Sequence, residues 1–165
     1  MSIACKAGWG LAAVLAAVTG VGGYMVFVGG NTVPYADGRT VVLLSADERN
    51  RVLGEMRGLL VGAKGIIQAS VQGDMATVAA EARAIGMAAA EGESAALMAK
   101  LPGAFLTMGM SAHRAMDDLA DLAESGAEPM QVLEALGEAM EVCTGCHAGY
   151  RLGVEGVDDK PGAAG

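Results

Sequence analysis

Apolar residues recur at steps of three and four positions through the middle of this chain. The first such set comprises Val52, Leu53, Met56, Leu59, Leu60, Ala63, Ile66, Ile67 and Val71. This spacing places apolar side chains on one face of an α-helix. Ser45 precedes the set, and Glu48 three residues later completes a capping box, which is a start signal for a helix. The pattern therefore predicts an amphipathic helix that begins at Ser45 and ends near Gly73.

Further helical segments follow, with short connections between them. Their expected bounds are residues 74–92, a short helix at 93–100, residues 103–125 and residues 129–153. Asp74 can cap the second helix, and Pro129 occupies a first helical position, where its missing N–H group costs nothing. Four long helices joined in this way predict an all-α fold, an antiparallel four-helix bundle over residues 45–153.

The two ends of the chain differ from the bundle in composition. Residues 9–28 form a stretch of 20 residues without a charge, which as a helix spans about 30 Å, the thickness of the bilayer hydrocarbon. Lys6 precedes the stretch, so the positive-inside rule places the N-terminus in the cytoplasm. We expect residues 1–30 to be a transmembrane anchor, with a cleaved signal peptide as the alternative. Residues 31–44 are expected to be a linker, and residues 154–165 a disordered tail.

Charge and composition exclude some function classes. The formal net charge of −8 and pI near 4.6 argue against nucleic acid as a partner, because surfaces that bind it are basic. The sequence contains no recognisable catalytic carboxylate pair, nucleophile–base set or phosphate-binding loop, so we do not expect an enzyme.

The most informative motif is C-x-x-C-H, formed by Cys143, Cys146 and His147. It is the attachment motif of a c-type haem, in which the thiols form thioethers and the imidazole binds the iron. Residues three apart share a helix face, so both thiols can reach one edge of the macrocycle. A zinc site is one alternative, but only His113 and Cys5 remain as further ligands of the kinds that structural zinc prefers. A thioredoxin-like redox pair is another, and it expects a strand–helix setting. We predict one covalently attached haem c.

The residues that follow this motif add to it and together resemble the ending of a known protein family. Residues 143–151, which include Tyr150 and Arg151, resemble the C-x-x-C-H-x-x-[YF]-R ending of class II cytochromes c, the cytochrome c-prime group. The resemblance covers about residues 45–153. It implies a Met early in the first helix as sixth iron ligand, and Met56 falls at the matching position. It also implies haem attachment outside the bacterial cytoplasm, and members that often dimerise, so a homodimer is left open here.

The bundle geometry brings Met56 and His147 close to one end of the fold, at a rise of about 1.5 Å per residue. Met56 is the expected sixth ligand and His113 the alternative, with an open iron as the third case. Tyr150 is expected to pack on the macrocycle. Arg151 either pairs with a haem propionate or favours the C-terminus of its helix.

Together these features predict a monohaem cytochrome c that transfers electrons. The haem domain is expected in the periplasm, anchored to the bacterial inner membrane by a single pass, with membrane-bound or membrane-associated redox proteins as partners. The alternatives are a five-coordinate cytochrome c-prime that binds NO or CO, and an accessory haem subunit of a larger membrane complex.

Overall fold

The protein is mostly helical in the computed structural model, which describes residues 3–27 and 29–158, with side chains at 8–24 and 29–158. The helices are α1 (Ile3–Phe27), α2 (Ala46–Gln72), α3 (Met75–Ala84), the 3-10 helix η1 (Met87–Ala90), α4 (Ala95–Lys100), α5 (Gly103–Glu124) and α6 (Pro129–Gly149). The strands are β1 (Thr32–Pro34), β2 (Thr40–Leu44) and β3 (Tyr150–Val154).

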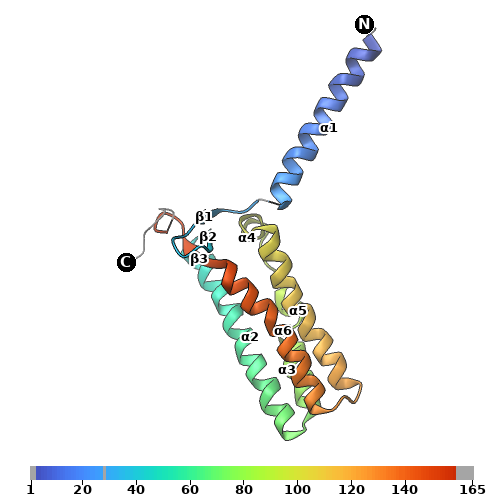
Figure 1. The fold of residues 1–165 in the computed structure, drawn as a ribbon, viewed down its shortest axis with the longest axis vertical. Coiled ribbons are helices and arrows are strands. Elements are labelled where there is room, and N and C mark those ends of the chain that lie inside the picture. Colours follow the sequence, from blue (N-terminus) through green and yellow to red (C-terminus); the bar gives the residue numbers. More distant parts are fainter. Residues whose placement is uncertain (1–2, 28, 159–165) are drawn as a thin grey trace.

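Helices α2, α3, α5 and α6 lie side by side and enclose the main core (Figure 1). Ile66, Val78, Leu119, Val132 and Leu136 are among its members, one or more from each of the four helices. Helix α2 contacts both α3 and α6, so the first and last long helices of the bundle are neighbours. The expected second helix is shorter than predicted, because α3 ends at Ala84 and the chain turns into η1.

The start and end of α2 agree with the sequence pattern. The backbone N–H of Glu48 donates to Ser45 Oγ at 3.3 Å, and the Ser45 N–H donates to Glu48 Oε2 at 2.8 Å. Gly73 ends the helix with φ of 72°, a left-handed conformation that glycine adopts without steric cost. These local signals explain why the bounds of this helix could be predicted closely.

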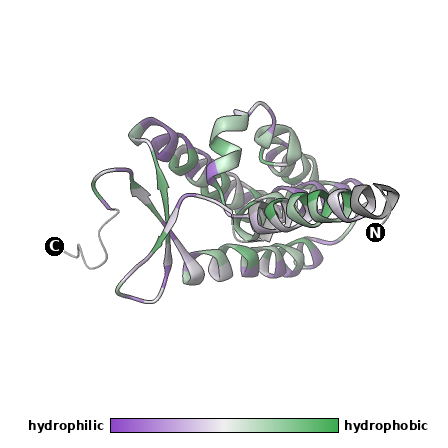
Figure 2. Cartoon of the chain, turned by 90° about the horizontal axis from the view of Figure 1, so that it is seen from above, coloured by the Kyte–Doolittle hydropathy of each residue, from purple (hydrophilic) through white to green (hydrophobic). Residues whose placement is uncertain are grey.

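A three-stranded sheet crosses the end of the bundle where α6 finishes (Figure 2). Strand β2 lies in the middle, antiparallel to β1 and parallel to β3, and Val41 is paired with Arg151. The linker prediction for residues 31–44 is therefore wrong where β1 and β2 form. The prediction that the last helix continues to Gly153 is also wrong, because α6 ends at Gly149 and β3 follows. Residues 41–44 are almost fully buried, and that burial favours the strand.

A polar network joins the sheet to the helices. The backbone N–H of Asn31 donates to the carbonyl of Lys100 at 2.8 Å, and its side chain donates to Glu155 at 2.9 Å. The Lys100 ammonium lies 2.7 Å from Glu48 and 3.0 Å from Glu155. The network therefore holds the approach to β1, the start of α2, the end of α4 and the turn after β3 together.

The residues after β3 differ from the predicted tail as far as they are described. Asp158 accepts a hydrogen bond from the Val154 N–H at 2.7 Å, which closes a turn. Residues 154–158 are therefore ordered by β3 and this turn, contrary to the prediction. The rest of the predicted tail, residues 159–165, lies outside the described residues.

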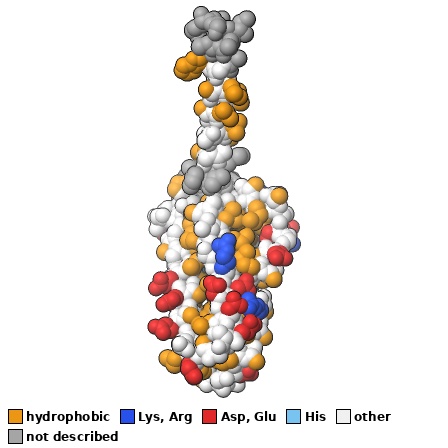
Figure 3. All heavy atoms as spheres, turned by 90° about the vertical axis from the view of Figure 1, so that its right-hand side faces the viewer, with side chains coloured by type: hydrophobic (Ala, Val, Ile, Leu, Met, Phe, Trp, Pro, Cys, Tyr) orange, Lys and Arg blue, Asp and Glu red, His pale blue; other side chains and the backbone are white. Residues whose placement is uncertain are grey.

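Helix α1 projects away from the bundle, and its described side chains carry no charge (Figures 1 and 3). Trp9, Leu11, Leu15, Val18 and Val21 are all well exposed. A search of the described part of the chain finds no helix long and apolar enough to cross a membrane. The transmembrane helix thus gains no support here and stays a prediction. Figure 3 also shows acidic side chains spread over one face of the bundle, in keeping with the net charge of −8.

Candidate functional site

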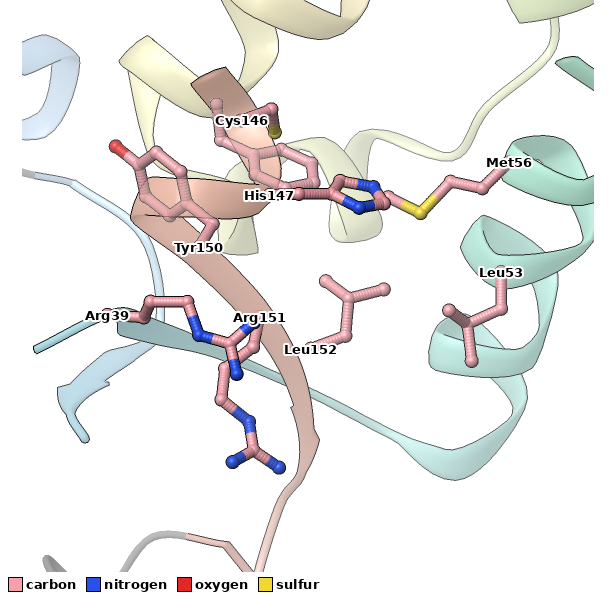
Figure 4. Close-up of a pocket in the computed structure, with 9 residues that line it drawn as sticks. Arg39, Leu53, Met56, Cys146, His147, Tyr150, Arg151 and Leu152 are labelled. Carbon is pink, nitrogen blue, oxygen red and sulfur yellow. The ribbon is translucent and has the colours of Figure 1, made fainter. Parts of the chain in front are cut away.

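A pocket of about 160 Å³ lies where the sheet meets the ends of α2 and α6 (Figure 4). It is lined by Arg39, Leu53, Met56, Phe105, Cys146, His147, Tyr150, Arg151 and Leu152. Five of these residues were site candidates from the sequence, and the fold brings them together from α2, α6 and β3. Most of the wall is apolar, and its polar groups are an imidazole, a phenol, a thiol and two guanidinium groups.

The C-x-x-C-H motif occupies the last turns of α6. Cys146 and His147 line the pocket, whereas Cys143 lies one turn earlier, half-buried and outside the lining. Neither Cys143 nor Cys146 forms a disulfide. Both thiols belong to α6 with a spacing of three, which places them on one face of that helix, and the attachment of a haem through both stays a prediction.

The structure bears on the two alternatives to haem attachment, the thioredoxin-like redox pair and the zinc site. Burial, and then the neighbouring Cys143, raise the pKa of Cys146 above its usual value. A thioredoxin-like pair needs a thiol of lowered pKa, commonly at a helix N-terminus, whereas these cysteines lie at a helix C-terminus. Among the described residues, no group of three or more His, Cys, Asp or Glu side chains is arranged to hold a metal ion. Neither alternative is therefore favoured by the geometry.

Met56 reaches the pocket from α2. Its thioether points toward the His147 imidazole in Figure 4, and Leu53 lies one turn earlier on the same wall. Met56 also packs against the cluster that includes Phe105 and Cys146. The prediction that Met56 and His147 lie at the same end of the bundle is confirmed, and the role of Met56 as an iron ligand stays a prediction.

His113 lies elsewhere. It is 8% exposed, and its Nδ1 is 2.9 Å from the carbonyl oxygen of Ile85. That carbonyl can only accept, so Nδ1 carries the proton. His113 lines a second, smaller cavity of about 80 Å³, and the structure does not bring it to the pocket that holds His147.

Two carboxyl groups in the second cavity were not found from the sequence. Glu55 and Glu93 both line it, and burial, followed by the adjacent Glu93 carboxyl, raises the pKa of Glu55 to about 7. Glu93 comes from the segment between η1 and α4, far from Glu55 along the chain. Their proximity depends on tertiary packing, and no local sequence signal indicates it.

Aromatic and cationic groups complete the wall. The rings of Phe105 and Tyr150 meet edge to face with centroids 5.5 Å apart. Tyr150 therefore lines the pocket, although it belongs to β3 and not to the last helix as predicted. The Arg151 guanidinium lies 3.9 Å from the centre of the Tyr35 ring. Arg39 was missed in the sequence because the hairpin that carries it was read as a linker.

The residues at this site carry the kinds of side chain that a covalently bound haem requires. Two thiols and an imidazole come from α6, and the Met56 thioether lies across the pocket from the imidazole of His147. Of the two thiols, only that of Cys146 lines the pocket, whose wall is mostly apolar. A pocket of about 160 Å³ is smaller than those that enclose drug-sized ligands, roughly 300–1,000 Å³. It would therefore surround part of a macrocycle and leave the remainder accessible.

Comparison of the chain with models of known protein families, with curated proteins and with solved structures returns no match. The functional interpretation accordingly depends on the donor groups of the pocket and on their arrangement.

Proposed function

We propose that this protein is a monohaem c-type cytochrome that transfers electrons between redox partners. The observation that carries the proposal is the placement of Cys146 and His147 at the end of α6, on a pocket that the Met56 thioether shares. This donor set suits a covalent haem with His/Met ligation better than any other cofactor considered. The arrangement of α2, α3, α5 and α6 supports the antiparallel four-helix bundle of class II cytochromes c as the finer description of the fold.

Each donor has a distinct task in this proposal. Cys143 and Cys146 would hold the haem through thioethers, and His147 would bind its iron. When bound, the haem supplies one-electron redox chemistry at its iron. Met56 would be the second ligand of the iron, which would raise the reduction potential and close the iron to external ligands.

The rest of the wall tunes the site rather than binding the iron. Phe105, Tyr150, Leu53 and Leu152 supply apolar surface and exclude water from one side of the pocket. A dry, apolar surrounding disfavours the more highly charged ferric state and therefore also raises the potential. The exposure of His147 leaves an edge of the site open to solvent, where a redox partner can approach.

The position of the domain in the cell is part of the proposal. We place residues 1–30 in the bacterial inner membrane and the haem domain in the periplasm, because residues 9–28 carry no charge, α1 projects from the bundle, and haem attachment belongs to that compartment. Partners are membrane-bound or membrane-associated redox proteins. The net charge of −8 favours partners that present a basic surface.

Production of the full chain in a bacterium with periplasmic haem maturation tests the proposal. We expect one haem that survives denaturing electrophoresis, an intact mass raised by one haem, and a low-spin optical and EPR spectrum. The variants Cys143→Ala and Cys146→Ala should lose the two-thioether product, while Cys5→Ala should retain it. Recovery in the carbonate-resistant membrane fraction tests the anchor separately.

Two results would contradict the electron-transfer proposal. A chain without covalent haem would remove its basis. A high-spin wild-type protein that readily binds NO or CO would instead support a gas-binding cytochrome c-prime.

A further inference from the structure

Two guanidinium groups line the candidate haem pocket, one from β3 and one from the residue that precedes β2. Arg151 belongs to β3 and is paired with Val41 of β2, and Arg39 immediately precedes β2. Both line the pocket, and Figure 4 draws them next to one another beside the apolar wall formed by Leu152. The pocket is therefore apolar over most of its surface and cationic on one side.

The hairpin between β1 and β2 holds Arg39 in place. Asp37 accepts from Arg39 Nε at 2.9 Å and from Nη2 at 2.7 Å, and it also accepts from the Arg39 backbone N–H at 3.1 Å. The Tyr35 N–H donates to the Arg39 carbonyl at 2.9 Å, which closes the hairpin. Gly38, with φ of 87°, supplies the left-handed residue that this turn needs. The side chain of Arg39 is thus oriented before any ligand arrives.

Arg151 is oriented by a different contact. Its guanidinium lies 3.9 Å from the centre of the Tyr35 ring, so the same hairpin that carries Arg39 also positions Arg151. Stacking leaves the edge of a guanidinium free to donate hydrogen bonds. Tyr35 and Asp37 therefore act as positioning residues for the two cations.

The local charge is opposite to that of the whole chain. Arg39 and Arg151 contribute two positive charges and Asp37 one negative charge, so this group of three is net positive in a protein of net charge −8. Guanidinium groups recognise carboxylates through paired hydrogen bonds in one plane. A ligand that matches this site has an apolar, planar body with carboxylates on one edge.

We propose that Arg39 and Arg151 form a clamp for the two propionate carboxylates of the haem, with the β1–β2 hairpin as the element that positions both. This inference rests on the proposed function and adds a binding role to a segment outside residues 45–153, the region that resembles class II cytochromes c. Each guanidinium pairs with a propionate and keeps it ionised. Arg39 pairs with Asp37 as well as with a propionate, and the Asp37 carboxylate offsets part of the positive charge of the two arginines.

The clamp has a consequence for the reduction potential. Oxidation leaves the ferric haem with one more positive charge, which nearby carboxylates stabilise and nearby guanidinium groups oppose. Arg39→Gln and Arg151→Gln should therefore each lower the potential, and Asp37→Asn should raise it. We expect the double arginine variant to change the reduction equilibrium about tenfold, or about 59 mV for a one-electron couple.

Spectroelectrochemical titration of the haem-loaded full chain is the first measurement. Arg114→Gln is the matched control, because Arg114 is an exposed arginine of α5 that lines neither cavity. The clamp is overturned if the Arg39→Gln and Arg151→Gln variants have the potential of Arg114→Gln. A chain that carries no covalent haem overturns the proposed function instead, so the two failures are distinguishable.

A second measurement does not depend on covalent attachment. The full chain with Cys143→Ala and Cys146→Ala is titrated with haemin and with haemin dimethyl ester, whose carboxylates are blocked, and binding is followed by the Soret band. We expect haemin to bind several-fold more tightly than the ester, and we expect Arg39→Gln with Arg151→Gln to remove this preference. Equal affinity for the two ligands before the arginines are replaced overturns the clamp.

Discussion

Met56 and His147 line the same pocket from neighbouring helices, with the Met56 thioether directed toward the His147 imidazole. The two residues are far apart in the chain and meet because α2 begins, and α6 ends, at the sheet end of the bundle. A thioether and an imidazole on facing helices form a pair of donors of the kind that holds a haem iron from both sides. This relationship makes the ligation proposal testable one residue at a time.

Replacement of Met56 by Ala should convert the haem protein from low spin to high spin. Under the proposed ligation, the change removes the second donor to the iron and opens the iron to external ligands. Optical and EPR spectra measure the spin state, and CO titration of the reduced protein measures access to the iron. We also expect a loss in the free energy of unfolding, smaller than the about 2–5 kcal/mol of a fully buried methionine, because the partly buried side chain packs against the apolar cluster.

Met98→Ala is the matched control for this substitution. Met98 packs against the same cluster but does not line the pocket of His147. It should therefore reduce stability and leave the spin state unchanged. Equal spectra for the two variants would rule out Met56 as the sixth ligand.

Substitution of His113 should affect stability and not the haem spectrum. His113→Leu removes the donor to the Ile85 carbonyl, and an unsatisfied buried carbonyl costs about 1–3 kcal/mol. His113→Asn places an amide donor near the position of Nδ1 and should recover part of that loss. Urea unfolding measures the stability. A high-spin spectrum for both variants would instead identify His113 as an iron ligand.

The sequence predicted the bundle better than the sheet, for a physical reason. The helix α2 is encoded locally, through Ser45, Glu48, Gly73 and a repeating apolar pattern. Strand β2 is a short apolar run that lacks alternation because it is buried on both faces, so it has no periodic signal. Its partner β3 follows directly on a helical pattern. Val41 and Arg151 pair in the sheet although nearly the whole bundle lies between them in the sequence. Tertiary packing, not a local sequence signal, therefore decides this pairing.

The same distinction applies to the site. Cys146 and His147 belong to one short motif, and Met56 belongs to a helix whose direction could be predicted, so the sequence placed all three at the pocket that they line. Arg39 reaches the pocket only because the β1–β2 hairpin folds over the end of the bundle. Its role could be identified only after the sheet was known.

Replacement of Gly153 by Ala should destabilise the sheet end of the protein. An added Cβ would lie 2.5 Å from Val41 Cγ1 and 2.9 Å from Asp158 Cβ, so β2 or the turn after β3 would have to shift. Overpacking of this kind costs about 1–3 kcal/mol. Gly137→Ala on α6 is the control, because its Cβ meets nothing within 4 Å and alanine favours a helix by about 1 kcal/mol. Thermal unfolding followed by circular dichroism should move in opposite directions for the two variants.

Acid should weaken the network that joins the sheet to α2. The Lys100 ammonium, followed by the Ser45 backbone N–H, lowers the pKa of Glu48 to about 2, against an ordinary value of 4.5. A carboxyl group whose pKa is lower in the folded state stabilises the fold above its unfolded pKa. That stabilisation is lost as the pH falls from about 4.5 through about 2. Urea unfolding at several pH values in this range measures the loss. Lys100→Met should reduce the pH dependence, whereas Lys64→Met, an exposed lysine of α2, should retain it. An unchanged pH dependence in Lys100→Met would show that the ion pair with Glu48 contributes nothing to acid stability.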